Sequence, residues 1–198
     1  MARLKKTEEE IKAEIIEAAR FLFMKYGFFK TTMEDIAKAV KKGKSTLYYY
    51  YKSKDEVFLD VINQVAKSLL FNIREKVNQI SSASEKLLGY FEILIEEVKG
   101  VLDLYRLILE ELKDNDYLSK NIDRLFYDKD IEFLESILVF GINRKEFLSL
   151  DMSNTKSLAE LLIIINRDLI SNYLLKNKRI EWEQSVRFLS SIILRGIR

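Results

Sequence analysis

The fold of the N-terminal part of this chain is decided by the stretch Thr32-Met-Glu-Asp-Ile-Ala-Lys-Ala-Val-Lys-Lys-Gly-Lys-Ser-Thr-Leu-Tyr-Tyr-Tyr-Tyr-Lys-Ser-Lys54. Its pattern predicts a short helix, a tight turn and a second short helix. Apolar residues recur at helical spacing from Met33 to Val40, which gives the first helix one buried face. Gly43 then interrupts the pattern, and we expect it to make the turn because glycine carries no Cβ.

Capping residues mark where the predicted helices of this stretch begin. Thr32 is followed three positions later by Asp35, and Ser53 in the same way by Glu56, so each pair predicts a capping box. The second short helix runs from about Lys44. Leu47 and Tyr51 are four residues apart, so both face inward.

The charge of this stretch has one sign. Six lysines and no acidic residue occur between Ile36 and Lys54, and four consecutive tyrosines lie in the second helix. Residues 1–54 hold 13 Lys and Arg against 7 Asp and Glu, whereas residues 55–198 hold 20 against 24. A basic end joined to a mildly acidic body is typical of a DNA-binding domain attached to a regulatory domain. The alternative is a basic face that is solvated and binds no partner. It agrees less well with the sequence, because the lysines coincide with the turn motif.

Residues of about 10–60 resemble the helix-turn-helix of the TetR/AcrR family of bacterial transcriptional regulators. The sequence departs from the family at the turn, where Val40-Lys41-Lys42-Gly43 replaces the usual small residue, glycine and apolar residue; the two extra lysines indicate more contact with phosphate. The matching residues are Tyr26-Gly27-Phe28, Thr31-Thr32, Asp35-Ile36-Ala37-Lys38, Lys44, Thr46-Leu47-Tyr48, Tyr50-Tyr51 and Lys52-Ser53-Lys54-Asp55.

The predicted DNA contacts divide into two groups. Lys44, Thr46 and Tyr48 lie opposite the inward residues of the second helix, so we expect them to enter the major groove. Residues at helix starts and in the turn are expected to hold the phosphate backbone. The full predicted DNA-binding set is Thr31, Thr32, Lys41, Lys42, Lys44, Ser45, Thr46, Tyr48, Tyr49, Tyr50 and Lys54.

The whole chain is predicted to be all-α, with about nine helices. It has 198 residues, no proline and only six glycines, and the helical apolar rhythm recurs along nearly all of it. We expect a three-helix DNA-binding domain at residues 1–53 and a larger helical regulatory and dimerisation domain at residues 54–198. The later helices are predicted at about 54–80, 83–99, 101–113, 117–140, 154–176 and 181–197.

The first helix is predicted to begin after Thr7 and to end at Gly27. Its expected buried stripe is Ile11, Ile15, Ala18, Leu22 and Tyr26. We expect Phe28 and Phe29 to close the small core together with Phe21, Ile36, Leu47 and Tyr51.

The composition argues against an enzyme. Cysteine and histidine are both absent, which excludes disulfides, thiolate chemistry, a Ser-His-Asp triad and His/Cys metal sites. No Gly-rich phosphate loop is present either. We therefore expect no cofactor, no metal and no catalytic residue.

A membrane location is not expected. The N-terminus is charged and lacks the pattern of a signal peptide. The longest strongly apolar stretch, residues 161–165, is far shorter than the roughly 20 residues of a membrane span. A cytoplasmic protein with no membrane partner is the consistent prediction.

The last two predicted helices are apolar around most of their circumference and must be covered on most sides. A partner subunit would cover the face left open by their own domain, with Leu161, Ile165, Phe188 and Ile192 in the interface. The alternative is that they are central core helices of a monomer, which is less consistent for the last helix of a chain. The resemblance implies a four-helix homodimer interface here.

Aromatic and aliphatic residues at helical spacing gather in the larger domain. They form either a plain core or an apolar cavity, and the resemblance implies a pocket for a small-molecule inducer. Asn166, Arg167 and Asp168 form either an interface ion pair or a polar corner of that pocket. The predicted pocket residues are Phe71, Tyr90, Phe91, Leu94, Tyr105, Leu109, Phe126 and Tyr127.

The function expected from these features is that of a ligand-responsive, homodimeric transcriptional repressor of a palindromic operator. Its expected partners are double-stranded DNA, a second copy of the chain and a small-molecule inducer. The alternative is a helical scaffold, or a protein that binds RNA or an anionic surface, without an inducer. Salt-sensitive binding of a dimer to a palindromic duplex separates the two.

Overall fold

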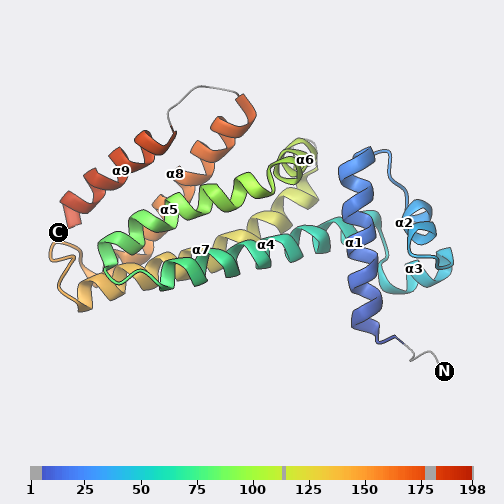
Figure 1. Ribbon diagram of the computed structural model, residues 1–198, viewed down its shortest axis with the longest axis horizontal. Coiled ribbons are helices and arrows are strands. Elements are labelled where there is room, and N and C mark those ends of the chain that lie inside the picture. The colour runs from blue at the N-terminus through green and yellow to red at the C-terminus, as the bar shows by residue number, and fades with distance from the viewer. Residues whose placement is uncertain (1–5, 113–114, 177–181, 198) are drawn as a thin grey trace. The chain divides into compact units, whose positions relative to one another are not determined.

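The computed structural model describes residues 6–112, 115–176 and 182–197, and every regular element in these ranges is helical (Figure 1). The all-α prediction is confirmed. The helices are α1 (Glu8–Tyr26), α2 (Met33–Ala39), α3 (Lys44–Tyr50), α4 (Lys54–Asn78), α5 (Ala83–Gly100), α6 (Leu102–Leu112), α7 (Asp116–Asn143), the 3-10 turn η1 (Met152–Asn154), α8 (Thr155–Lys176) and α9 (Trp182–Ile197).

Helix ends follow the local signals in the sequence. Thr7 and Glu10 form a capping box at the start of α1, and Ser82 caps α5 by accepting a hydrogen bond from the Glu85 backbone. Gly27 ends α1 with a φ of 84°, a value that side chains rarely allow. The predicted boundaries therefore agree with the observed ones to within a few residues.

The chain folds into two compact units. The first comprises Met1–Ala66 and Asp103–Ile122, and the second comprises Lys67–Leu102 and Asp123–Arg198. Helices α4 and α7 each contribute residues to both units. The domain boundary between residues 53 and 54 stays a prediction.

An aromatic cluster forms the core of the first unit. The rings of Phe28 and Phe58 are 4.7 Å apart, and Phe23 lies 5.4 Å from Phe58 in an edge-on arrangement. Ile15 and Leu47 are fully buried in the same unit. The ring contacts join α1, the turn after it and the start of α4.

Three of the aromatic residues predicted for this core lie on the surface instead. Phe21 is 60% exposed, Tyr26 51% and Phe29 78%. The buried stripe of α1 runs through Ala19 and Phe23. The prediction was wrong at these three positions because Phe23, Phe28 and Phe58 already fill the interior, and close packing leaves no room for more rings.

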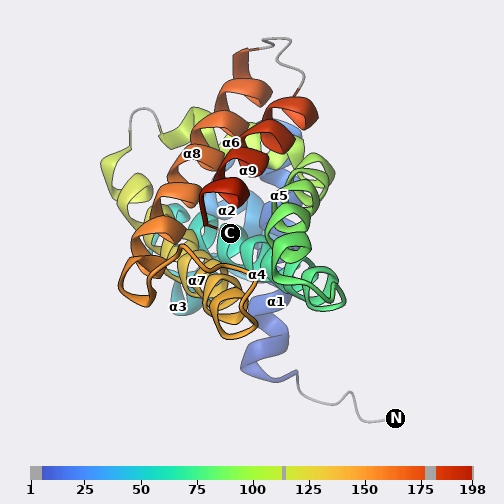
Figure 2. The same cartoon turned by 90° about the vertical axis from the view of Figure 1, so that its left-hand side faces the viewer.

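The second unit packs helices from both of its chain segments. Helices α5 and α9 are in contact (Figure 2). The Arg187 side chain of α9 forms an ion pair with the Glu92 carboxylate of α5 at 2.8 Å. The backbone N–H of Ser149 donates to the carbonyl of Ile197 at 3.0 Å, which holds the C-terminal end of α9 to the turn after α7. Phe147 is buried beside that turn.

Candidate nucleic-acid interface

Helix α2 is fixed at its start by side-chain hydrogen bonds. The Thr32 hydroxyl accepts from the backbone N–H of Asp35 at 3.2 Å, and the Asp35 carboxylate accepts from the Thr32 hydroxyl at 2.6 Å and from its backbone N–H at 3.0 Å. These bonds to Thr32 lower the pKa of Asp35. The predicted capping box is confirmed.

The turn between α2 and α3 differs from the prediction. Gly43 has a φ of −69° and caps α3, so its backbone is not in the left-handed conformation that favours glycine in a tight turn. Lys41 adopts the left-handed conformation instead, with a φ of 54°. Backbone bonds explain the difference: the Lys42 N–H reaches back to the Ala37 carbonyl at 2.9 Å, which ends α2 through a left-handed residue at position 41.

Helix α3 is anchored on its inner face. Leu47 is fully buried and Tyr51 is 4% exposed, as predicted from their spacing. The Tyr51 hydroxyl donates to the Asp60 carboxylate of α4 at 2.9 Å. Burial, reinforced by the negative charge of Asp60, raises the pKa of Tyr51, so this phenol stays protonated and keeps α3 attached to α4.

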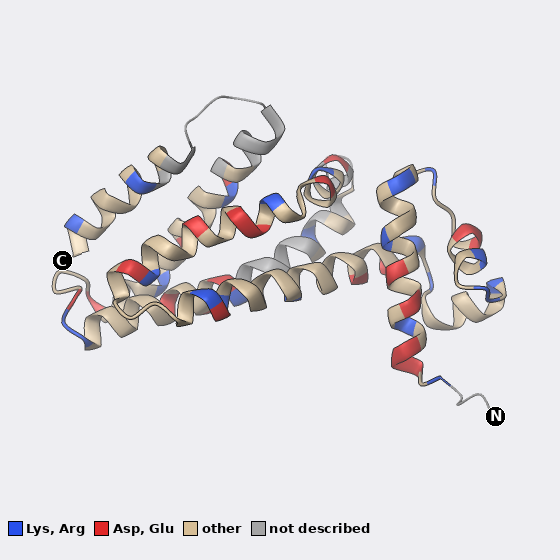
Figure 3. Ribbon diagram, viewed as in Figure 1, with Lys and Arg blue, Asp and Glu red and all other residues tan. Residues whose placement is uncertain are grey.

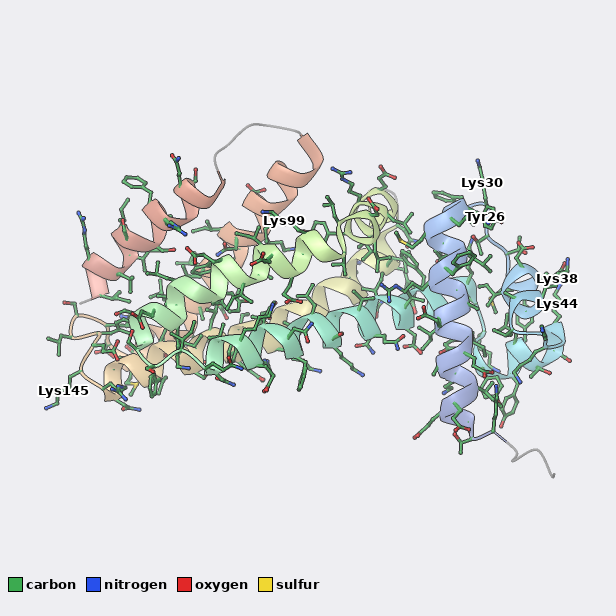
Figure 4. The ribbon with its side chains drawn as sticks, in the orientation of Figure 1. Tyr26, Lys30, Lys38, Lys44, Lys99 and Lys145 are labelled. Atoms are coloured by element: carbon green, nitrogen blue, oxygen red, sulfur yellow. The ribbon has the colours of Figure 1, made fainter. Side chains whose placement is uncertain are left out.

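The opposite face of α3 is open to solvent. Lys44, Ser45, Tyr48 and Tyr49 are exposed, and the Tyr49 ring meets that of Tyr50 edge-on at 5.1 Å. Thr46, Tyr50 and Lys42 are half-buried, and Lys41 is exposed. Figure 3 shows the basic residues of the α2–α3 turn, and Figure 4 shows Lys38 and Lys44 near each other in this unit.

Sequence reasoning missed one member of this surface. The Glu34 carboxylate of α2 forms an ion pair with the Lys44 ammonium group of α3. The hydrogen bond between them lowers the pKa of Glu34 and raises that of Lys44. No local pattern signals this pair, because the two residues are ten positions apart and meet only when the turn brings α2 and α3 together.

Three residues predicted to bind phosphate make contacts within their own unit instead: Thr31, Thr32 and Lys54. Thr31 is buried, and its hydroxyl donates to the Gly27 carbonyl at 2.8 Å. The Lys54 ammonium group donates to the Phe28 carbonyl at 2.7 Å and lies 4.1 Å from the centre of the Phe28 ring. The Thr32 hydroxyl belongs to the capping box. Their contacts with DNA stay predictions.

This arrangement suits a duplex better than it suits other partners. A short helix with one buried face presents hydroxyl, phenol and ammonium groups on its other face, and such groups bond base edges and phosphates. Lysines of the adjoining turn add positive charge beside it. A helix of this width fits the major groove of B-DNA.

The predicted pocket residues have several different environments. In the second unit Tyr90 and Phe91 are buried with their rings 5.3 Å apart, Leu94 is half-buried and Phe71 is 64% exposed. Tyr105 is half-buried in the first unit. The side chains of Leu109, Phe126 and Tyr127 lie outside the described part of the structure.

The predicted interface residues on α8 and α9 all reach the surface. Leu161 is 55% exposed, Ile165 37%, Phe188 68% and Ile192 51%. Asn166 is buried, and its amide donates to the Leu162 carbonyl at 2.8 Å, one helical turn earlier. None of the described helices is long and apolar enough to cross a bilayer.

The sequence pattern of bacterial regulatory proteins of the tetR family matches residues 15–61, which include most of α1, the α2–α3 motif and the first part of α4. The chain belongs to the TetR family. An HTH-type transcriptional regulator of Bacillus subtilis, YfiR, is 26% identical over 178 residues, which are 86% of this chain and 83% of YfiR.

Solved TetR-family structures share the fold along the whole chain. A putative TetR-family transcriptional regulator from Syntrophomonas wolfei superposes with a TM-score of 0.73 at 18% identity, covering 97% of this chain and 98% of the other. The TetR-family repressor FadR of Thermus thermophilus, in complex with lauroyl-CoA, gives a TM-score of 0.72 at 22% identity, covering 94% and 95%. The chain is a DNA-binding transcriptional regulator of this family.

Proposed function

We propose that this TetR-family regulator is a ligand-responsive homodimeric repressor that binds a palindromic operator. The observation that carries the proposal is the exposed face of α3 beside the basic turn, held in place by Leu47 and by the bond from Tyr51 to Asp60. An exposed helix on a rigid support can enter a major groove without unfolding any part of its unit.

The dimer is supported by the exposed apolar residues on α8 and α9. Isolated apolar side chains are common on protein surfaces, but a concentration of them on two neighbouring helices is typical of an interface. An isologous dimer presents two copies of α3, and a two-fold axis matches a palindrome whose half-sites are about 34–36 Å apart.

The ligand response is supported by a structural relative and by the course of α4. The Thermus FadR structure contains lauroyl-CoA, which shows that this fold accommodates a molecule with a long apolar body. Because α4 contributes residues to both units, a ligand that alters its second half also acts on the unit that carries α3. The coupling between ligand and DNA is expected to be about 1–3 kcal/mol.

The test is a binding screen with duplexes from the region around the protein's own coding sequence. We expect one palindromic fragment to bind as a complex of two chains per site, with an affinity that falls steeply with salt. A scrambled duplex of the same length and composition is the control. Equal affinity for the two duplexes at every salt concentration would contradict operator recognition.

A further inference from the structure

The second unit contains a buried polar cluster that neither the DNA-binding surface nor the predicted dimer interface uses. It consists of Arg74 on α4, Tyr90 on α5 and Asp130 on α7, with the Phe133 ring near Arg74 and Tyr90. The Arg74 guanidinium carbon lies 5.2 Å from the centre of the Phe133 ring, and the Tyr90 and Phe133 rings are 6.0 Å apart. Three helices therefore bring one cation, one phenol and one carboxyl group together.

The cluster is incompletely paired. Arg74 donates from a terminal nitrogen to the Lys129 carbonyl at 2.7 Å, but its Nε has no hydrogen-bond partner among the described residues. Tyr90 Oη and Asp130 Oδ1 are also buried without a hydrogen bond of normal geometry, although the two side chains are close enough for each to shift the pKa of the other. As whole residues, Arg74 and Asp130 are partly exposed. A buried polar atom without a partner costs about 1–3 kcal/mol, so three in one place indicate a group that binds something.

Several sequence neighbours of the cluster residues are apolar and buried. Ile73 and Val77 flank Arg74 on α4, and Leu87 precedes Tyr90 by one turn of α5, all of them buried. Ile131 and Leu134, next to Asp130 and Phe133 on α7, are buried as well. A ligand that reaches these polar atoms needs a polar head on an apolar body.

The charges of the cluster favour an anionic head over a cationic one. Arginine keeps its proton in proteins, so the positive charge of Arg74 is permanent. Burial raises the pKa of Asp130 to about 7, opposed by Arg74 and Tyr90, and burial also raises the pKa of Tyr90. With Asp130 ionised, its charge balances that of Arg74 and the cluster is neutral. When Asp130 takes up a proton near neutral pH, the cluster carries a net positive charge, and in neither state is its net charge negative.

We propose that Arg74, Tyr90 and Asp130 form the site for the carboxylate head of an apolar organic acid. Arg74 Nε, the Tyr90 hydroxyl and the protonated Asp130 carboxyl group donate hydrogen bonds to the carboxylate, and the proton on Asp130 comes from solvent. The inference rests on the proposed ligand response and specifies the chemistry of its ligand.

The test uses the full-length protein and three ten-carbon probes below their micelle concentrations: decanoate, decanamide and decylammonium. Titration calorimetry in buffers of different ionisation enthalpy measures affinity and proton uptake. We expect decanoate to bind more tightly than the other two, with uptake that approaches one proton per site at pH 8. Its affinity should rise about tenfold from pH 8 to pH 6, because Asp130 is then already neutral.

Three variants separate the site from general apolar binding. Asp130→Asn keeps a donor, so decanoate should still bind, but without proton uptake and without pH dependence. Tyr90→Phe should weaken decanoate binding about tenfold or more and leave decanamide less affected. Glu132→Gln, which changes an exposed carboxylate on the same helix, is the matched control and should behave as the wild type.

Two results would overturn the proposal. One is decanamide or decylammonium binding as tightly as decanoate; the other is equal proton uptake in the wild type and Asp130→Asn. Tighter binding of decanoyl-CoA without proton uptake would place a neutral thioester at the cluster and overturn it too. Operator affinity is measured separately: decanoate that binds as expected but leaves it unchanged supports the site and contradicts the proposed ligand response.

Discussion

Lys44 is the residue of α3 whose chemistry is best suited to reading a base. It is exposed at the start of the helix, and its ammonium group is paired with the carboxylate of the equally exposed Glu34. An exposed ion pair contributes little to stability, so Lys44 can exchange Glu34 for DNA at small cost. This makes Lys44 a candidate donor to a guanine edge.

We expect Lys44→Ala to weaken operator binding and to relax specificity at one base position, by about 1–3 kcal/mol. The measurement is the affinity for the operator and for all single-base variants of one half-site. Lys38→Ala, which removes an exposed lysine of α2, is the matched control. An equal loss on operator and random DNA would show that Lys44 contacts phosphate alone.

Asp130 makes folding depend on pH in an unusual direction. Folding raises the pKa of the Asp130 carboxyl group from its ordinary value of 3.8 to about 7. The folded state therefore binds this proton more tightly than the unfolded state does. The stability that this proton provides is complete below about pH 4 and is lost as the pH rises to about 7. Ionisation of a buried carboxyl group is the cause.

Asp130→Asn removes this loss. Relative to the wild type, the variant should gain stability as the pH rises from 4 to 8, up to about 4 kcal/mol at about 1.4 kcal/mol for each unit of pKa. Urea denaturation of both proteins at a series of pH values measures the difference. A difference that does not change with pH would contradict the assigned protonation.

At the scale of elements, the start of α3 lacks a side-chain cap, so a capping residue there should increase stability. Gly43 caps this helix without a side-chain hydrogen bond, and its φ of −69° is allowed to any residue. A Cβ at this position would lie 3.8 Å from the Ser45 hydroxyl oxygen, which is an ordinary contact. Gly43→Ser should stabilise the protein by a few tenths of a kcal/mol, measured by thermal unfolding.

The matched change at the start of α2 should act in the opposite direction. Thr32→Ala removes a capping box that is present, so it should destabilise the protein by about 1 kcal/mol. If Gly43→Ser lowers the melting temperature instead, the extended conformation of Gly43 is wrong.

The end of α7 depends on a glycine for its packing. A Cβ on Gly141 would lie 2.1 Å from the ring of Phe147, which is 1% exposed. Gly141→Ala therefore forces the ring or the helix to move, and we expect a loss of about 1–3 kcal/mol in the free energy of unfolding. Gly100→Ala is the control, since its Cβ would meet nothing within 4 Å. Equal stability of both variants would contradict this packing.

At the scale of the whole molecule, α8 and α9 both carry large apolar side chains that are exposed on a single chain. Phe188 and Ile192 lie one turn apart on α9 and are 68% and 51% exposed, and Leu161 on α8 is 55% exposed. In an isologous dimer each of these residues occurs twice near the two-fold axis, so a single charge is introduced in two copies.

We expect Ile192→Glu to separate the dimer and to abolish tight operator binding, while the first unit keeps its fold. Sedimentation at micromolar concentration measures the mass, and circular dichroism measures the helix content. Lys156→Glu, at an exposed polar position on α8, is the control. A wild-type protein that sediments as a 23.4 kDa monomer would contradict both the interface and the two-half-site mechanism.

The sequence by itself determined where most helices begin and which residues of α3 face inward. The capping boxes at Thr7 and Thr32, and the spacing of Leu47 and Tyr51, act within four residues, so they can be read without knowing the fold. The same local pattern supplied the candidate DNA-binding residues, whose roles remain predictions.

Only the tertiary structure decided which of several similar residues occupy the core and which distant residues meet. Phe23 and Phe28 are buried whereas Phe21 and Phe29 are exposed, because the interior has a limited volume and sequence spacing does not rank rings that compete for it. The cluster of Arg74, Tyr90 and Asp130 draws on three helices. Its charges interact through space, and their distances follow from helix packing, which no local pattern encodes.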